Sequence, residues 1–172
     1  RQQDADFVNL SPCSDHRAQW SNNLVPEHVV SQIRARLMSG NMIALRSHLT
    51  VRRKGISDQP THFDIFLWEQ PNETGRPIFI REGLTITDVR GARARGILSI
   101  VVVHDKPLAT LLGDSENPAH TQWQKTSSNF KNKYAYGQNH IEFVRRAVER
   151  IVSVTRDSGE EHDVTTLADI FP

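Results

Sequence analysis

The order of apolar and polar positions predicts one helix near the beginning of the chain. Between Pro26 and Gly40, apolar residues recur at helical spacing, at Val29, Val30, Ile33 and Leu37. Proline suits the first turn of a helix and glycine suits its end. Residues 1–25 are polar without a sustained period, which predicts an arm or linker that docks through Phe7, Leu10 and Trp20.

Three segments after this helix have the pattern of strands. Residues 43–51 alternate between apolar and polar, which predicts a half-buried strand with His48 on its polar, solvated face. Residues 62–68 (HFDIFLW) and 77–81 (PIFIR) predict two further strands, and a short extended piece follows at 85–87. The segments between these strands are short and polar, which favours antiparallel pairing.

Residues 97–103 (ILSIVVV) are almost continuously apolar and β-branched. This composition predicts a strand that is buried on both faces and central in the sheet. The order of elements predicts an α+β fold of two layers, with a mainly antiparallel sheet of four to five strands covered by helices. We expect residues 26–172 to form one such domain.

Two short helices are predicted directly after the central strand. Pro107 and Gly113 bound a very short first helix. Asn117 can cap a second helix and Pro118 can begin it, so we expect this helix to run to about Gln124.

The clearest helix is the last one. One of its faces is apolar, and it is formed by Ile141, Val144, Val148, Ile151 and Thr155. We expect this helix to lie across the sheet and to end at residues 157–159 (DSG). The apolar LADIF run, residues 167–171, predicts a tail that docks on the body or begins a further segment.

Composition and charge narrow the classes of function. Cys13 is the only cysteine in 172 residues, so the chain has neither a disulfide framework nor a zinc site of paired cysteines. The net charge of +1 gives no overall attraction for nucleic acid. No apolar run is long enough to span a membrane, and no signal peptide is visible, so we expect a cytoplasmic protein without a membrane partner. Because the chain opens at Arg1 with a polar stretch, we expect a fragment of a larger protein.

The segment LLGDSENPAHTQW, residues 111–123, concentrates side chains that can carry chemistry. Asp114, Glu116 and His120 could bind a divalent metal or form an acid–base group in a hydrolase or nuclease. Their spacing matches no metal motif. In the structural alternative, which we favour, Glu116 lies beside the amino end of the next helix and Asn117 caps that helix.

Two basic residues are candidates for phosphate contact. Arg81 ends a strand just before Glu82 and Gly83, and an arginine fork matches phosphate oxygens. A surface ion pair is the alternative interpretation of Arg81. Lys106 begins a short helix, where anions are favoured. The chain has no glycine-rich phosphate loop, so nothing in it would cradle a phosphate unaided.

Three basic clusters support a further hypothesis. Residues 52–54, 90–95 and 125–133 are rich in arginine or lysine. Such clusters usually form solvated loops, and the alternative is a nucleic-acid-binding module whose affinity falls steeply with salt.

Four segments together resemble a known family: FDIFLWEQ (63–70), RPIFIREGLTITD (76–88), RARGILSIVVVHDKPLATLLGDSENPAHTQWQ (93–124) and LADIF (167–171). They resemble the carboxy-terminal part of large bacterial GHKL-type ATPases, which are related to MutL, gyrase B and microrchidia-type ATPases. Several members of that group belong to restriction or phage-defence gene clusters. The resemblance covers roughly residues 42–171.

The resemblance implies a transducer domain, an α+β fold of the left-handed β-α-β type that closes on an ATPase domain. That amino-terminal domain of the same chain would be the main partner, with DNA and a second copy of the parent as further partners. ATP and magnesium would belong to the parent, and the fragment itself would hold no cofactor and carry no catalytic residue. A basic residue of the transducer touches the γ-phosphate in related proteins, and Arg81 and Lys106 are the candidates here, with Lys125 behind them.

Overall fold

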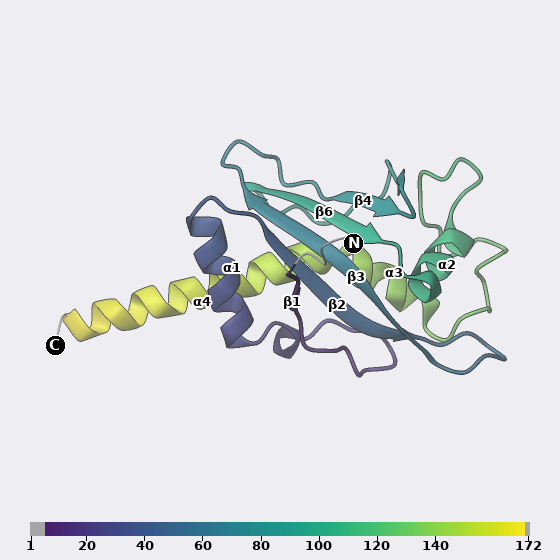
Figure 1. Cartoon of the computed structure of the whole chain (residues 1–172), viewed down its shortest axis with the longest axis horizontal. Coiled ribbons are helices and arrows are strands. Elements are labelled where there is room, and N and C mark those ends of the chain that lie inside the picture. Colours follow the sequence, from purple (N-terminus) through teal and green to yellow (C-terminus); the bar gives the residue numbers. More distant parts are fainter. Residues whose placement is uncertain (1–5, 171–172) are drawn as a thin grey trace.

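One mixed β-sheet of six strands organises the chain in a computed structural model that describes residues 6–170, with side chains described for residues 6–158. The strand order is β1-β2-β3-β6-β4-β5. The bounds are Val8–Asn9 for β1, Ile43–Val51 for β2, Gln59–Glu69 for β3, Ile78–Arg81 for β4, Leu84–Thr85 for β5 and Ile97–Val103 for β6. The predicted α+β class is confirmed (Figure 1).

The sheet differs from the predicted one in its strand number and directions. β2–β3, β3–β6 and β4–β5 are antiparallel, whereas β1 pairs with β2 and β4 pairs with β6 in parallel. The prediction of a mainly antiparallel sheet failed because β4 does not pair with β3, its predecessor in the chain. The more apolar β6 takes the place between them, and the short β4 and β5 are left at the edge, where short strands are tolerated.

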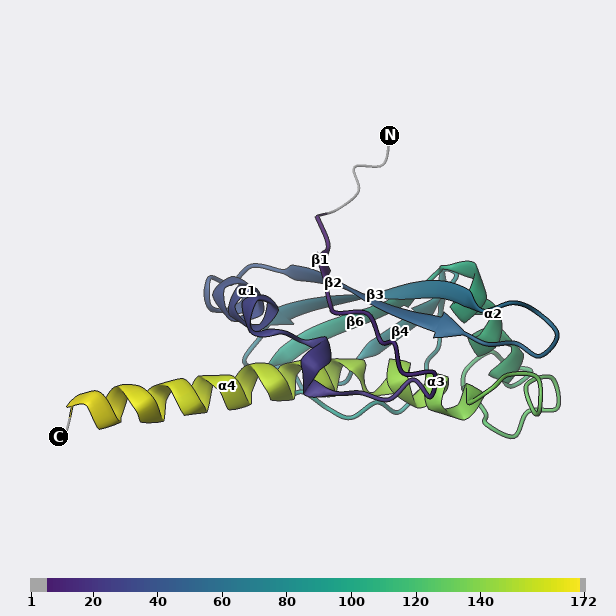
Figure 2. The same ribbon diagram turned by 90° about the horizontal axis from the view of Figure 1, so that it is seen from below.

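Four helices complete the fold of the described residues. Their bounds are Glu27–Met38 for α1, Lys106–Ser115 for α2, Gly137–Arg145 for α3 and Ala147–Ile170 for α4, and a 3₁₀ turn spans Asn22–Leu24. Figure 2 shows α3 and α4 along one face of the sheet, with α1 and α2 near its two ends. The core lies between this face and the helices.

The predicted last helix is two helices, α3 and α4, that break at Arg146. In an unbroken helix the carbonyl of Phe143 would accept from the amide of Ala147. Here the indole N–H of Trp20 donates to that carbonyl at 2.8 Å, and the two aromatic rings stack with centroids 4.3 Å apart. The break therefore coincides with docking of the arm.

The predicted end of the last helix at residues 157–159 was also wrong, because α4 continues to Ile170. Glycine within a helix costs only about 1 kcal/mol relative to alanine, and this weak stop signal did not end the helix. The predicted docking of the LADIF tail lies outside the residues whose side chains are described.

The arm packs against the domain as the sequence predicted. Val8 and Asn9 add strand β1 to the sheet, and Leu10 is buried. Phe7 meets Phe66 edge to face, with ring centroids 5.9 Å apart. Residues 7–25 thus contribute to the packing of the domain.

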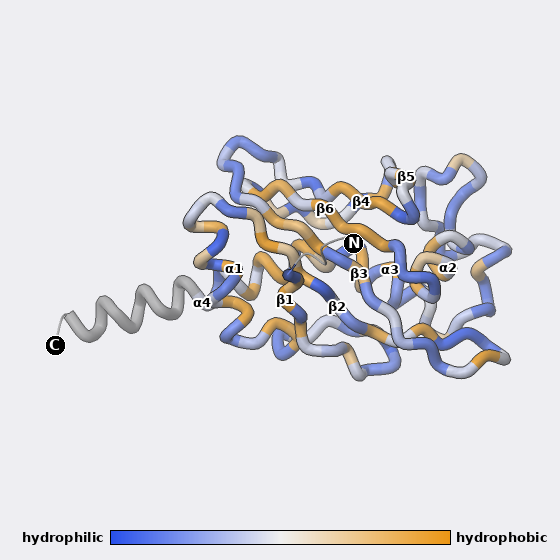
Figure 3. Tube along the Cα trace, in the orientation of Figure 1, coloured by the Kyte–Doolittle hydropathy of each residue, from blue (hydrophilic) through white to orange (hydrophobic). Residues whose placement is uncertain are grey.

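The position of β6 in the sheet confirms one part of its prediction and corrects the other. The strand is central, but its residues alternate between buried and half-buried, because helices cover only one face of the sheet. On the other face, which we call the open face, β3, β6 and β4 expose a continuous apolar surface to which Figure 1 gives a direct view. It consists of Phe66, Trp68, Ile78, Ile80, Leu98, Ile100 and Val102. The hydrophobic colouring of β4 and β6 in Figure 3 follows the same strands.

Candidate functional site

A tight hairpin between β4 and β5 places Arg81 and Glu82. Arg81 pairs with Leu84 across a two-residue turn made of Glu82 and Gly83. Both turn residues have positive φ, +46° and +81°, as hairpin turns of type I′ require. Glycine adopts this conformation freely, whereas Glu82 adopts it at a cost. The turn directs Arg81 to the helix-covered face and leaves Glu82 exposed at the tip.

Arg81 forms a buried, two-fold ion pair with Glu116. Its Nε donates to Oε1 of Glu116 and its Nη2 donates to Oε2 at 2.9 Å. Only 8% of Arg81 and 1% of the Glu116 side chain are exposed. The guanidinium lies against α2 at Gly113, where an added Cβ would lie 3.4 Å from the Cζ of Arg81. The sequence-based alternative was a surface ion pair of Arg81 with its neighbour Glu82. That pair forms, at 2.7 Å, but Arg81 is buried, and Glu116 is a second partner that the alternative did not include.

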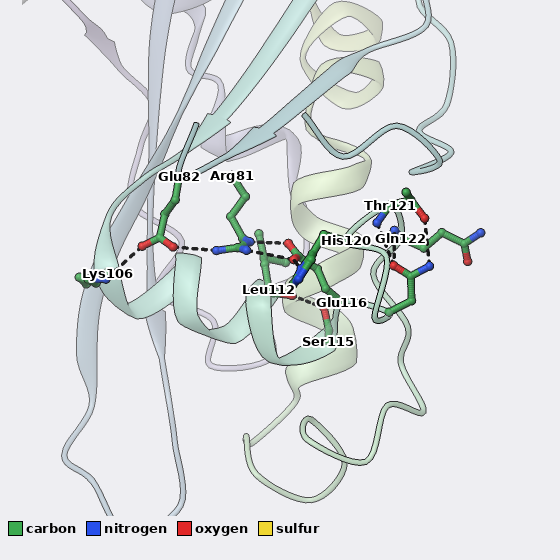
Figure 4. Close-up of polar contacts among 10 residues, drawn as sticks. Arg81, Glu82, Lys106, Leu112, Ser115, Glu116, His120, Thr121 and Gln122 are labelled. Atoms are coloured by element: carbon green, nitrogen blue, oxygen red, sulfur yellow. Dashed lines mark hydrogen bonds and ion pairs between the residues drawn. The ribbon is translucent and has the colours of Figure 1, made fainter. Parts of the chain in front are cut away.

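Two further contacts extend this pair into a chain of charges. Nη1 of Arg81 also donates to Oε2 of Glu82 at 2.7 Å, and Oε1 of Glu82 accepts from Lys106 Nζ at 3.1 Å. At the other end, Nδ1 of His120 lies 2.8 Å from Oε2 of Glu116. We call this series, Lys106–Glu82–Arg81–Glu116–His120, the ion chain (Figure 4). Both of its ends are accessible, with 84% of the Lys106 side chain and 59% of the His120 side chain exposed.

The segment that carries Glu116 and His120 is a closed loop, so the predicted helix through Gln124 was wrong. Oδ1 of Asn117 accepts from the amides of Thr121 and Gln122, at 2.8 and 3.2 Å. A helix cap would instead bond to amides two or three residues ahead. The preceding helix is longer than predicted, because α2 continues through Gly113 to Ser115. These differences bring Glu116 to the end of α2, facing Arg81.

The ion chain shifts the protonation of its members. Burial raises the pKa of the Glu116 carboxyl, but the hydrogen bonds from Arg81 and His120 outweigh it and hold the pKa below its ordinary value. The hydrogen bond from Lys106 likewise lowers the pKa of Glu82. The hydrogen bond to Glu116 raises the pKa of the Arg81 guanidinium despite its burial. At neutral pH the carboxyls and the guanidinium are charged.

We expect the stability contributed by Glu116 to disappear in acid. A carboxyl whose pKa is lower in the folded than in the unfolded protein stabilises the fold above the unfolded pKa, which is near 4.5, and loses this effect as pH falls through the folded pKa. The free energy of unfolding, measured in urea from about pH 6 to pH 3, should therefore fall more steeply for the wild type than for Glu116→Gln. The difference in free energy of unfolding between the wild type and Glu116→Gln should therefore become smaller in acid. Glu69→Gln, which removes an exposed carboxyl at the end of β3, should keep the wild-type slope, and parallel curves for Glu116→Gln would contradict the expectation.

Asp114 does not join Glu116 and His120. Its carboxylate accepts from the Tyr134 hydroxyl at 2.6 Å and lies 2.9 Å from Lys133 Nζ, in the segment that follows the loop. Among residues 6–158, the side chains whose ligand atoms gather closely enough for a metal do not include these three. The arrangement gives no support to a metal-dependent hydrolase built on them.

Members of two of the three basic clusters, at 52–54 and 125–133, pair with carboxylates, whereas the three arginines at 90–95 are exposed. Lys125 lies 3.0 Å from Glu142, and Lys133 pairs with Asp114. Residues 52–54 run beside residues 133–135 through backbone hydrogen bonds.

Cys13 is buried, and burial raises the pKa of its thiol, which makes it a poor nucleophile near neutral pH.

No known protein family, curated protein or solved structure matches this chain. None of the helices within residues 6–170 is both long enough and apolar enough to cross a membrane. Sequence reasoning identified Arg81 and Lys106, but it missed that Glu82 links them and that Glu116 anchors them.

Proposed function

We propose that this chain is a non-catalytic transducing domain of a GHKL-type ATPase, which couples the state of the bound nucleotide to engagement of a partner or of DNA. The observation that carries the proposal is the ion chain. It connects the β4–β5 hairpin, α2 and the loop at residues 116–124, and it ends on an exposed ammonium group. Three separate segments thus respond to one charge at the surface.

Lys106 is the residue of this chain that would meet the γ-phosphate. Its side chain is exposed, and its described ion-pair partner is the flexible carboxylate of Glu82. Arg81 is the weaker candidate because its guanidinium already serves two carboxylates and is buried. A phosphate near Lys106 would compete with Glu82, and release of Glu82 would leave Arg81–Glu116 as the ion pair that joins the hairpin to the end of α2.

The open face supplies the surface on which the amino-terminal ATPase domain would dock. A single covered face is enough for this domain to fold, yet β6 is as apolar on its open side as on its buried side. Apolar surface of this kind marks a site of contact with another protein surface. ATP and magnesium would be bound by the ATPase domain, and this domain would supply a charged contact without taking part in covalent chemistry.

The test is made in the parent protein that contains this sequence. We expect Lys106→Ala to lower the rate of ATP hydrolysis about tenfold or more, because a charged contact to the transferred phosphate is lost. Lys106→Arg should retain most of the activity. Lys131→Ala, which removes an exposed lysine from the segment at 125–136, is the matched control and should leave the rate unchanged. An unaffected rate in Lys106→Ala, or a parent without an ATP-binding domain, would overturn the proposal.

A further inference from the structure

Three ligand-type side chains converge on the open face, where β3 begins and β6 ends. They are His62 and Asp64 of β3 and His104, which directly follows β6. One ligand atom from each lies within 4.8 Å of the other two. None of the three was predicted as a ligand, because His104 lies 40 positions after Asp64 in the chain.

The register of the sheet produces this convergence. His62 and Asp64 are two residues apart on one strand, so they share a face. Asp64 is paired with Val102 in the antiparallel β3–β6 ladder, and continuing that register places His104 opposite His62. The two imidazole rings accordingly lie with centroids 5.9 Å apart. Backbone pairing, rather than flexible loop contacts, therefore sets their separation.

Neighbouring groups orient the two β3 residues. Arg46 donates to both oxygens of Asp64, at 2.8 and 3.1 Å, which fixes the orientation of the carboxylate. A carboxylate has about four lone-pair positions, so the arginine leaves half of them for a metal. Nδ1 of His62 lies 3.8 Å from Oδ2 of Asp105, and that oxygen accepts from the Thr61 hydroxyl at 2.8 Å. At this distance there is no hydrogen bond, but a small movement of either side chain would let Asp105 accept from the imidazole, which is the usual support of a metal-bound histidine.

We propose that His62, Asp64 and His104 form a binding site for a first-row divalent transition metal, for which Zn²⁺ is the best fit. Two imidazoles and one carboxylate are zinc-type ligands, whereas Ca²⁺ and Mg²⁺ prefer sets of oxygens. Metal–ligand bonds of about 2.0–2.2 Å put tetrahedral ligand atoms roughly 3.4 Å apart, so small side-chain rotations close the site. His104 is exposed, which leaves a fourth position open to water or to a side chain of a docked partner.

The experiment consists of two titrations of the untagged protein. Binding of ZnCl₂ is measured by calorimetry, and binding of CoCl₂ is measured by visible absorption. We expect one ion per chain, cobalt bands typical of tetrahedral coordination, and a rise in Tm with zinc. His104→Ala should weaken zinc binding by at least about tenfold and abolish the rise in Tm. Because His104 is exposed, this variant is expected to fold. His62→Gln, whose fold is checked by circular dichroism, provides a second loss of a ligand.

His28→Ala is the matched control, since it removes an exposed histidine from α1. It should bind zinc with wild-type affinity. The proposal is overturned if no event of one ion per chain is seen, if His104→Ala binds as tightly as the wild type, or if Mg²⁺ competes equally with zinc. None of these outcomes depends on ATP hydrolysis, so this inference stands or fails independently of the proposed function.

Discussion

Replacing Glu116 by alanine is expected to lower the free energy of unfolding by about 3–5 kcal/mol. The variant leaves the guanidinium of Arg81 in a site that is 8% exposed, without the carboxylate that accepts its Nε and Nη2 protons. Glu82 still accepts from Nη1, but the buried Nε and Nη2 protons lose their acceptor without regaining their hydration, and this cost exceeds the loss of the hydrogen bonds themselves. Chemical unfolding in urea at pH 7, with the same slope for both proteins, provides the measurement.

A double-mutant cycle separates the pair from its surroundings. The double variant Arg81→Ala/Glu116→Ala should lose less free energy of unfolding than the two single variants lose together. The reason is that the double variant leaves neither charge buried without the other. The surface pair Arg52–Asp58, at 3.4 Å with 40% and 56% of the side chains exposed, is the control. Asp58→Ala, which breaks this surface pair, should lower the free energy of unfolding by no more than about 1 kcal/mol. Equal costs at the two pairs would show that Arg81 and Glu116 are not the buried anchor of the ion chain.

Gly75→Ala should destabilise the protein by about 2–5 kcal/mol. Gly75 has a φ of +80°, and a Cβ there would overlap the backbone carbonyl of Ala94. The amide of Ala94 donates to the carbonyl of Gly75 at 2.9 Å, so neither backbone can move away without losing this bond. The contact holds the chain leaving β3 against the chain entering β6, and it thereby sets where β4 and its hairpin begin.

Gly40→Ala separates two causes of destabilisation, which are steric overlap of the added Cβ and the cost of a positive φ for a residue with a side chain. Gly40 has a similar φ of +73°, but a Cβ at that position meets nothing within 4 Å. Its replacement should cost only the conformational part, about 1–2 kcal/mol. Thermal and urea unfolding of both variants give the comparison. If Gly75→Ala is no worse than Gly40→Ala, the close approach to Ala94 does not constrain the fold.

Much of the local structure could be predicted because its signals are local. The alternation over residues 43–51 became β2 with the predicted bounds, and His48 lies half-buried on the open face, hydrogen-bonded to Asn9 at 2.8 Å. Proline and glycine correctly bounded α1. In each case the side chains of one segment, repeating with one period, decide which face is buried.

The candidate site could be predicted only in part. Arg81 and Lys106 stood out because each has a charge at the end of an element, but Glu116 is 35 positions from Arg81, and no spacing rule connects them. The same is true of His104 and the two ligand-type residues of β3. Their proximity follows from the placement of β6 beside β3, which buries one apolar face of β6 against the helices.

By itself the sequence determined most of the longer elements, their apolar faces and the α+β class, since those depend on residues a few positions apart. The tertiary structure decided where β6 inserts, where the last helix breaks and how Asn117 closes its loop. The residues that start and end a helix each contribute about 1 kcal/mol to the free energy of folding. Burying a central strand, or satisfying a buried arginine, is worth several times more, so these non-local terms prevail wherever the two disagree.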